Sequence, residues 1–383
     1  MQAPPKKSRW VRFAKRVLIG VVLLLLCAAL AGAAYQAIAN WRDARRFPQE
    51  GRSIALGVDF PGVSLNLNCM GQGSPTVILD SGLGVPAAGW GLVMRDVAKF
   101  ARVCSYDRAG YGWSSAGPMP RTSGEIVQEL HALLAASEEK GPFVLVGHSF
   151  GGYNVRIYAD KYPADVAGLV LVDTSHEDQE QLMPPSLKKL TEDQVKQLDS
   201  QRHLMPILIF FGIARLTAGD DGDSKLSKEF RDKMKYLQLQ TKFIDSAFSE
   251  IKSFSLSAEE VRRTGNLGDR PLVVLTAGKD LEAKDLPKGV SVEEMRKFRK
   301  TWVSDLQVRQ ARLSTRGKQI IVPDSTHMIP MERPDAVVKR DPRGLRRREG
   351  GTGAEKLKDV QWREPKAQKH PSGNIEVLMS DIS

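Results

Sequence analysis

The chain has 383 residues, of which 42% are hydrophobic, and this is enough to bury the core of one large domain. Such a composition excludes a disordered or low-complexity protein. The net charge of +11 belongs to the ends of the chain, because residues 1–46 carry +8, residues 339–383 carry +4, and residues 47–338 carry −1. We therefore expect that the central region does not bind nucleic acid.

A basic segment at the start of the chain precedes a long apolar run. Residues 1–16 hold six Lys or Arg and no acid, and the 23 residues from Val17 to Ala39 carry no charge. A helix of that length spans about 35 Å, enough to cross a hydrocarbon core of about 30 Å. The charge bias predicts a single-pass anchor at residues 1–46 with a cytoplasmic N-terminus and an extracytoplasmic body. The alternative is a cleaved signal peptide and a secreted body, since Ala31-Gly32-Ala33 has small residues suited to cleavage.

Strands and helices alternate through residues 47–338. Apolar runs bounded by Gly and Pro predict strands at residues 54–60, 63–70, 76–80, 101–106, 143–147, 169–173, 271–276 and 319–322. Apolar residues at helical spacing predict helices at residues 90–99, 123–138, 151–161 and 291–313. The alternation predicts an α/β domain with a mostly parallel sheet and helices on both faces.

Residues 176–265 interrupt this alternation. No strand pattern recurs there, whereas residues 204–216 and 230–248 have helical patterns. We expect a helical cap over the carboxyl edge of the sheet, where ligands bind in such folds. After Val338, helix breakers and basic residues predict that residues 339–383 form a basic, disordered tail.

The strongest functional signal is Gly147-His148-Ser149-Phe150-Gly151. It follows the apolar run 143–146 directly and precedes the helical pattern of residues 151–161. A strand that enters a helix with almost no loop makes a tight turn, and a serine at its apex projects its hydroxyl. The sequence therefore predicts that Ser149 is a nucleophile.

Two further residues follow predicted strands in the order that a serine nucleophile requires. Asp280 comes after the strand at 271–276, and His327 comes after the strand at 319–322. A serine needs a base to accept its proton and a carboxylate to orient the base. We favour Asp280 as that carboxylate, and Asp173, which ends the strand at 169–173, remains the alternative.

Together these motifs resemble the α/β-hydrolase family, in its ester-hydrolase branch, across residues 54–338. The resemblance also includes Tyr106-Asp-Arg-Ala-Gly-Tyr-Gly and the inserted cap. It implies a hydrolase that cleaves a small-molecule acyl substrate through an acyl-enzyme, with Ser149 as the nucleophile, His327 as the base and no cofactor. A serine, where the dehalogenase and epoxide-hydrolase branches use aspartate, argues against both of those reactions.

The resemblance places the oxyanion hole at the backbone N–H groups of Leu83 and Phe150. Many relatives have His-Gly where this chain has Ser81-Gly82, so we expect the hole to persist with a different hydrogen bond behind it. Two other uses of the site stay open: acyl transfer or cofactor-free lyase or peroxidase chemistry. A binding module that kept the fold is the non-enzyme alternative. The sequence does not indicate the substrate or the oligomeric state.

Neither the cysteines nor the other histidines have metal-ligand spacing. Cys69 and Cys104 lie in strand-like segments and fit small buried residues, although a bridge between them is left open. His148 is expected to serve in packing beside the nucleophile, because adjacent side chains diverge on a tight turn. His176-Glu177-Asp178 could suggest a metal site, but no matching ligand cluster accompanies it in the sequence.

Overall fold

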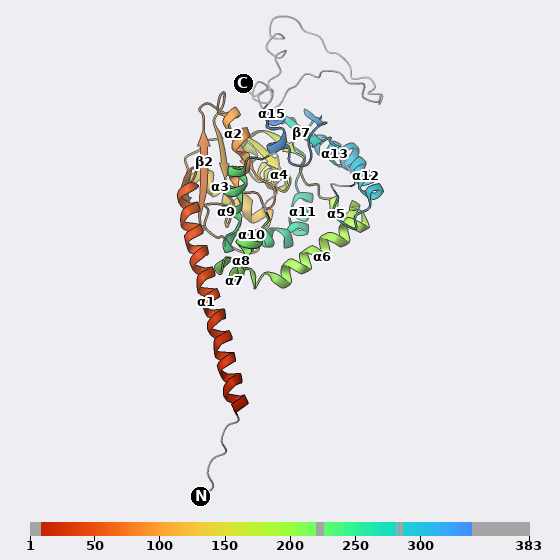
Figure 1. Cartoon of the computed structure of the whole chain (residues 1–383). Helices are drawn as coiled ribbons and strands as arrows, with labels where there is room; N and C mark the ends of the chain where they lie inside the picture. Colours follow the sequence, from red (N-terminus) through yellow and green to blue (C-terminus); the bar gives the residue numbers. More distant parts are fainter. Residues whose placement is uncertain (1–8, 220–225, 281–282, 284–285, 339–383) are drawn as a thin grey trace, which may run out of the picture.

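A computed structural model describes residues 9–219, 226–280, 283 and 286–338 of the protein (Figure 1). Its centre is a twisted sheet in the strand order β1-β2-β4-β3-β5-β6-β7-β8. Strand β2 is antiparallel to β1 and β4, and the strands from β4 to β8 are parallel to one another. The mostly parallel sheet predicted from the sequence is confirmed. The strands are β1 (Arg52–Ala55), β2 (Ser64–Met70), β3 (Thr76–Asp80), β4 (Val103–Tyr106), β5 (Phe143–His148), β6 (Val166–Val172), β7 (Leu272–Ala277) and β8 (Gly317–Val322).

Helices cover both faces of this sheet, because successive side chains of the central strands point to opposite faces. In β5, Leu145 belongs to the apolar cluster under α3 (Ser123–Ala136), α4 (Gly151–Lys161) and α11 (Phe254–Arg262). Its neighbours Val144 and Val146 belong to the cluster on the other face, under α2 (Gly91–Val97) and α15 (Pro334–Val338). All three residues are fully buried. Burial on both faces explains why β5 reads as a continuous apolar run.

The remaining helices of the body connect or follow the strands, and η2 among them lies directly before the start of β6. They are η1 (Ala87–Trp90), η2 (Pro163–Asp165), α12 (Val292–Thr301), a π-helical turn at Trp302–Leu306, α13 (Gln307–Ala311) and α14 (Ile329–Glu332). The π-helical turn connects α12 and α13 without a break, in the segment where the sequence predicts one helix. It positions Trp302, which takes part in the site described below.

A series of helices separates β6 from β7, and no strand interrupts them among the described residues. This is the interval for which the sequence predicts a cap. The helices are α5 (Gln179–Leu182), α6 (Pro185–Gln201), α7 (Met205–Phe210), α8 (Ile213–Thr217), α9 (Lys228–Gln238), α10 (Thr241–Lys252) and α11. Figure 1 places α6, α7, α8 and α10 at the end of the body nearest the exposed length of α1. Of these helices, α7 packs directly against α1.

The N-terminal helix α1 (Arg9–Arg46) projects away from the body (Figure 1). It is long and apolar enough to cross a membrane, with a mean hydropathy of 2.8 over its most apolar window and none of that window buried. A 38-residue helix is about 57 Å long, and Figure 1 shows only its C-terminal part beside the body. The tail predicted at residues 339–383 lies outside the described residues.

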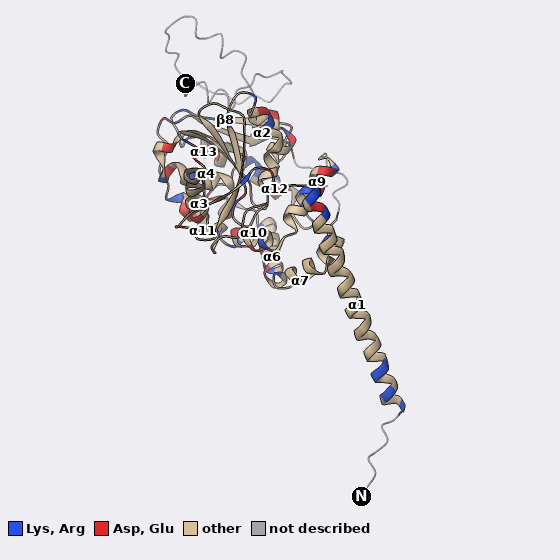
Figure 2. Ribbon diagram, turned by 90° about the vertical axis from the view of Figure 1, so that its left-hand side faces the viewer, with Lys and Arg blue, Asp and Glu red and all other residues tan. Residues whose placement is uncertain are grey.

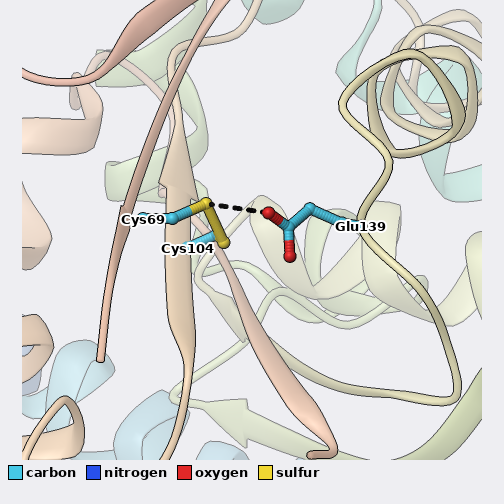
Figure 3. Close-up of side chains that lie close together, drawn as sticks. All are labelled: Cys69, Cys104 and Glu139. Carbon is cyan, nitrogen blue, oxygen red and sulfur yellow. Dashed lines mark hydrogen bonds between the residues drawn. A yellow bond between two sulfur atoms is a disulfide. The ribbon is translucent and has the colours of Figure 1, made fainter. Parts of the chain in front are cut away.

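Cys69 and Cys104 form a disulfide (Figure 3). The two residues are directly paired between antiparallel strands β2 and β4, with their Cα atoms 4.1 Å apart. Reading them as separate small buried residues was therefore wrong, and the bridge left open by the sequence is present. Glu139 lies beside the two sulfurs and is held by Arg102, whose Nε donates to Oε2 at 2.8 Å. Sulfurs that are bonded to each other do not offer thiolate ligands to a metal.

Candidate active site

Ser149 occupies the turn between β5 and α4. Its φ of 52° lies in the left-handed region, which is costly for a residue with a Cβ. The two flanking glycines allow the turn: a Cβ on Gly147 would lie 2.6 Å from the carbonyl oxygen of Gly151, and a Cβ on Gly151 would lie 2.5 Å from that of Asp80. The turn therefore matches the strand–serine–helix geometry expected from the sequence.

His327 reaches the serine from the loop after β8. Its Nε2 lies 2.9 Å from the Oγ of Ser149, and its side chain is 46% exposed. The other ring nitrogen, Nδ1, lies 2.7 Å from Oδ2 of Asp173. Since a carboxylate only accepts, Nδ1 carries the hydrogen and Nε2 is free to accept the serine proton. This tautomer is the one that a general base requires.

Asp173 follows β6, the strand next to β5 in the sheet. Its side chain is 2% exposed, and its φ of 43° is again in the left-handed region. The second carboxylate oxygen, Oδ1, accepts the backbone N–H of Ala277 and the indole N–H of Trp302, both at 3.0 Å. Burial raises the pKa of Asp173, but the interactions with His327 and the hydrogen bonds from Trp302 and the Ala277 N–H together lower it overall. The carboxylate is therefore ionised and fixed in orientation.

The prediction that Asp280 orients the base is corrected by this contact. His327 is engaged by Asp173, whereas Asp280 is exposed beyond the end of β7. After β7, the N–H of Gly278 bonds to the carbonyl of Val322 and the N–H of Lys279 bonds to the carbonyl of Ser325. These bonds direct the chain along the loop after β8. The alternative that the sequence analysis left open, Asp173, is the residue at the histidine.

The turn after β3 packs against the serine and carries one candidate oxyanion donor. A Cβ on Gly82 would lie 3.2 Å from the Cβ of Ser149 and 3.0 Å from Nδ1 of His148, so the backbone passes directly over the site. Within the described residues, the N–H groups of Leu83 and Phe150 have no protein acceptor. Both remain candidates for binding a negatively charged oxygen.

Arg108 holds that turn from behind. Its guanidinium donates to the carbonyl oxygens of Ser81 at 2.6 Å and Gly82 at 3.0 Å. It also donates to Asp80 at 3.0 Å and to both carboxylate oxygens of Glu250 at 2.8 and 2.9 Å. All three nitrogens are used, and the side chain is 2% exposed. These bonds link the turn to cap helix α10, whereas the buried hydroxyl of Ser81 itself has no hydrogen-bond partner among the described residues.

Two tyrosines and an amide complete the surroundings of this arginine. The hydroxyl of Tyr106 donates to Asp80 at 2.6 Å, that of Tyr111 donates to Glu250 at 2.7 Å, and Asn154 donates to Asp80 at 3.1 Å. Burial raises the pKa of Asp80, and Arg108, Tyr106 and Asn154 offset only part of that effect. The pKa of Arg108 is well above its usual value because two buried carboxylates oppose the effect of its own burial. The cluster is thus a closed ionic network without access to solvent.

His148 precedes Ser149 in the chain, and its ring contacts other residues. Its Nε2 is 2.9 Å from the backbone oxygen of His327, and its ring meets Trp90 edge-on. A carbonyl only accepts, so Nε2 carries the hydrogen. Burial, with a contribution from His327, lowers the pKa of His148 to about 3. The packing position expected for His148 agrees with these contacts.

The His176-Glu177-Asp178 segment is occupied by local contacts. Arg156 forms an ion pair with Glu177 at 2.7 Å, Nδ1 of His176 accepts the N–H of Asp178, and Arg262 and Arg309 both contact the carboxylate of Asp178. These partners account for the three side chains as a structural cluster.

The contacts of Arg108 with the Ser81-Gly82 turn were not predicted from the sequence, and Asp280 was favoured over Asp173. Arg108 belongs to the Tyr106-Asp-Arg-Ala-Gly-Tyr-Gly motif, but its carboxylate partners come from β3 and α10, which are 28 and 142 residues away in the sequence. Asp173 had an available signal, because it ends the strand that directly follows the nucleophile in sequence. Trp302 had no local signal, since its role depends on the π-helical turn.

Similar proteins agree with this fold. The chain is similar to YqjL, an uncharacterized protein of Bacillus subtilis, with 34% identity over 103 residues that cover 27% of this chain and 41% of that protein. Among solved structures, a mutant of DbjA is similar in fold, with 15% identity and a TM-score of 0.55. The aligned region covers 76% of this chain and 95% of the DbjA chain. A structure from work on epoxide hydrolases in metagenomes from hot environments has 19% identity and a TM-score of 0.53. The aligned region covers 76% of this chain and 96% of that protein.

The family profile described as the alpha/beta hydrolase family matches residues 77–340. This range begins in β3 and includes the Ser149 turn, the cap helices and His327. The matched range is well over half of the chain, and the structural likenesses independently give the same fold. This protein belongs to the alpha/beta hydrolase family.

Proposed function

We propose that the protein is a serine hydrolase that cleaves a carboxylic ester or a related acyl substrate through an acyl-enzyme. The observation that carries this proposal is the hydrogen-bonded series from Asp173 through His327 to Ser149, with contacts of 2.7 and 2.9 Å. The solved structures of similar fold include epoxide hydrolases. The residue at the turn of this chain is a serine, which favours acyl chemistry here.

In this mechanism the Oγ of Ser149 attacks the acyl carbon while its proton passes to Nε2 of His327. Asp173 stabilises the imidazolium, and the N–H groups of Leu83 and Phe150 donate to the oxygen that becomes negatively charged. The leaving alcohol then takes the proton from His327. A water molecule then attacks the acyl carbon while Nε2 accepts its proton. The same nitrogen returns that proton to the Oγ of Ser149 as the acyl bond breaks, which releases the acid and restores the free serine.

We also propose that α1 anchors the catalytic domain on the extracytoplasmic side of a membrane. The hydropathy of α1 and the six basic residues before its apolar run favour that orientation. The Cys69–Cys104 disulfide adds support, because disulfides persist mainly in oxidising compartments.

The catalytic proposal is tested by labelling the full-length protein with a fluorophosphonate, which reacts with activated serines. We expect labelling of the native chain and its loss in Ser149→Ala and His327→Ala. The control is His131→Ala, since His131 stacks on Tyr162 at the surface of α3. Equal labelling of the native protein and Ser149→Ala would rule out Ser149 as the nucleophile. Circular dichroism would confirm that each variant is folded.

A further inference from the structure

Cap helices α7 and α8 expose large apolar side chains that have no cover in the described structure. Leu204, Ile207, Phe210, Ile213 and Leu216 are between 43% and 68% exposed. All five lie within 13 residues of sequence. Burying a side chain of this size removes about 1.5–3 kcal/mol of unfavourable contact with water, so a cluster of five exposed ones indicates an interaction surface.

This surface has no exposed charge. Between Leu204 and Gly219 the one charged residue is Arg215. Its side chain is 11% exposed and donates to Asp43 at 2.5 Å, to Asn40 at 2.9 Å and to Gln36 at 3.2 Å. The charge is therefore directed toward α1 and neutralised there, which leaves the outward side of α7 and α8 apolar.

Helix α7 lies directly against α1 in both views (Figure 1, Figure 2), and α8 contacts α1 through Arg215. The backbones are in close contact: a Cβ on Gly32 would lie 2.4 Å from the carbonyl oxygen of Phe211, and a Cβ on Gly212 would lie 2.8 Å from the ring of Tyr35. Next to this contact is a groove of about 560 Å³. Its lining is apolar and consists of Ala28, Ala29, Ala31, Gly32, Tyr35, Phe211, Ile213 and Leu216.

The position on α1 at which α7 makes contact determines how deep the cap helices would lie in a bilayer. Gly32 lies ten residues before Arg42, the first charged residue after the apolar run, which is about 15 Å along the helix axis. If α1 spans a membrane, residues 28–35 lie within the outer half of the hydrocarbon core. Figure 2 shows this part of α1 and the neighbouring α7 without charged residues. The apolar side chains of the cap are then at the same depth as lipid acyl chains.

We propose that α7 and α8 insert into the outer leaflet beside α1, and that acyl chains of lipid fill the groove between them. The inference rests on the proposed anchoring by α1. Continuity with the apolar run of α1 and the absence of exposed charge favour the bilayer as the occupant. The protein is thereby held at two places, so that the cap and not only the N-terminal helix contacts lipid.

The test uses nitroxide spin labels on the full-length protein in phosphatidylcholine vesicles. In a Cys27→Ser background, Phe210→Cys and Leu216→Cys report on the cap, Leu25→Cys reports on the anchor, and Ile321→Cys is a body control with 51% exposure. Oxygen, which concentrates in hydrocarbon, and a water-soluble nickel chelate present on both sides of the membrane each relax the labels. Fluorophosphonate labelling confirms that each labelled protein remains folded.

We expect labels at 210 and 216 to resemble the label at 25, with strong relaxation by oxygen and several-fold weaker relaxation by nickel than at 321. Nickel-dominated relaxation at 210 and 216, with oxygen dominating at 25, would overturn cap insertion and leave the anchor intact. Nickel-dominated relaxation at 25 would overturn the anchor and the inference together. Weak relaxation by both reagents at 210 and 216 would also overturn the inference, because it would indicate a second protein copy on that surface.

Discussion

Two polar assemblies meet at Ser149, and they differ in their access to water. On one side, His327 is 46% exposed and connects the serine to the buried Asp173. On the other side, Arg108 and Glu250 are at most 2% exposed and connect the Ser81-Gly82 turn to cap helix α10. Each assembly pairs a buried carboxylate with a nitrogen-bearing side chain, which is an imidazole that can exchange a proton in the first and a guanidinium that stays protonated in the second. The comparison indicates that the accessible histidine pair is suited to proton transfer, whereas the enclosed arginine pair is suited to holding the Ser81-Gly82 turn in place.

The largest effect is expected from removing the charge of the carboxylate on the accessible side. Asp173→Asn keeps the shape of the side chain but presents an amide to Nδ1 of His327, so the histidine loses the partner that fixes its tautomer. We expect kcat for ester hydrolysis to fall by about 10³–10⁴-fold, with the far-ultraviolet circular dichroism unchanged. A loss of less than tenfold would show that Asp173 does not orient the base.

The enclosed side is tested by Arg108→Met, which leaves Asp80 and Glu250 buried without their cation. We expect the free energy of unfolding to fall by about 3–5 kcal/mol, measured by urea titration. In conditions where the variant is folded, kcat should also fall, because the Ser81 and Gly82 carbonyls lose their donors.

Arg121→Met is the matched control for that change. Arg121 forms an equally buried pair with Glu129, with contacts of 2.5 and 2.6 Å, and it does not contact the turn beside Ser149. We expect a similar loss of stability but an unchanged kcat in the folded protein. If Arg108→Met kept its kcat as well, the arginine would have a role in stability alone.

A smaller effect is expected from His148, which is buried and neutral beside the exposed His327. Its pKa is about 3 in the folded protein against 6.5 for an ordinary histidine, so below pH 6.5 the unfolded chain binds a proton that the folded chain does not. The stabilisation is complete above pH 6.5 and is lost at about 1.4 kcal/mol per pH unit as the pH falls toward 3. Urea titrations at several pH values, with His148→Asn for comparison, would measure the slope. Equal slopes in the two proteins would contradict this prediction.

The smallest effect is expected from Asp280→Asn. This side chain is exposed and the histidine already has its carboxylate, so kcat and the free energy of unfolding should stay within experimental error of the native values. The same assays serve for Asp173→Asn, which makes the two variants a direct comparison. A large loss of activity in Asp280→Asn would reinstate it as the functional acid.

Local patterns were sufficient for the parts of the site that depend on one strand and its turn. The bounds predicted for α4 and for β3 agree with the structure, and Ser149 and His327 are adjacent as their positions after strands suggested. Helix α6 was not predicted, although Leu187, Leu190 and Leu198 recur at helical spacing, and none of its residues is buried in the structure.

The features that were predicted wrongly or not predicted depend on contacts between segments that are distant in the sequence. Asp173 and Asp280 both follow strands, and only the path of the chain after β7 separates their roles. The Cys69–Cys104 bridge requires β2 to pair with β4 in the sheet, although β3 lies between them in the sequence. A pairing that skips a strand is set by the topology of the whole sheet, which local periodicity does not encode.

That same bridge has a practical consequence for making the protein. It closes a loop of about 35 residues, and the chain-entropy relation gives such a crosslink about 3–4 kcal/mol of stabilisation. Material expressed in a reducing cytoplasm would be a different covalent species from material exported to an oxidising compartment. The choice of expression host therefore sets which form of the enzyme is assayed, and a free-thiol titration should precede any comparison of activities between preparations.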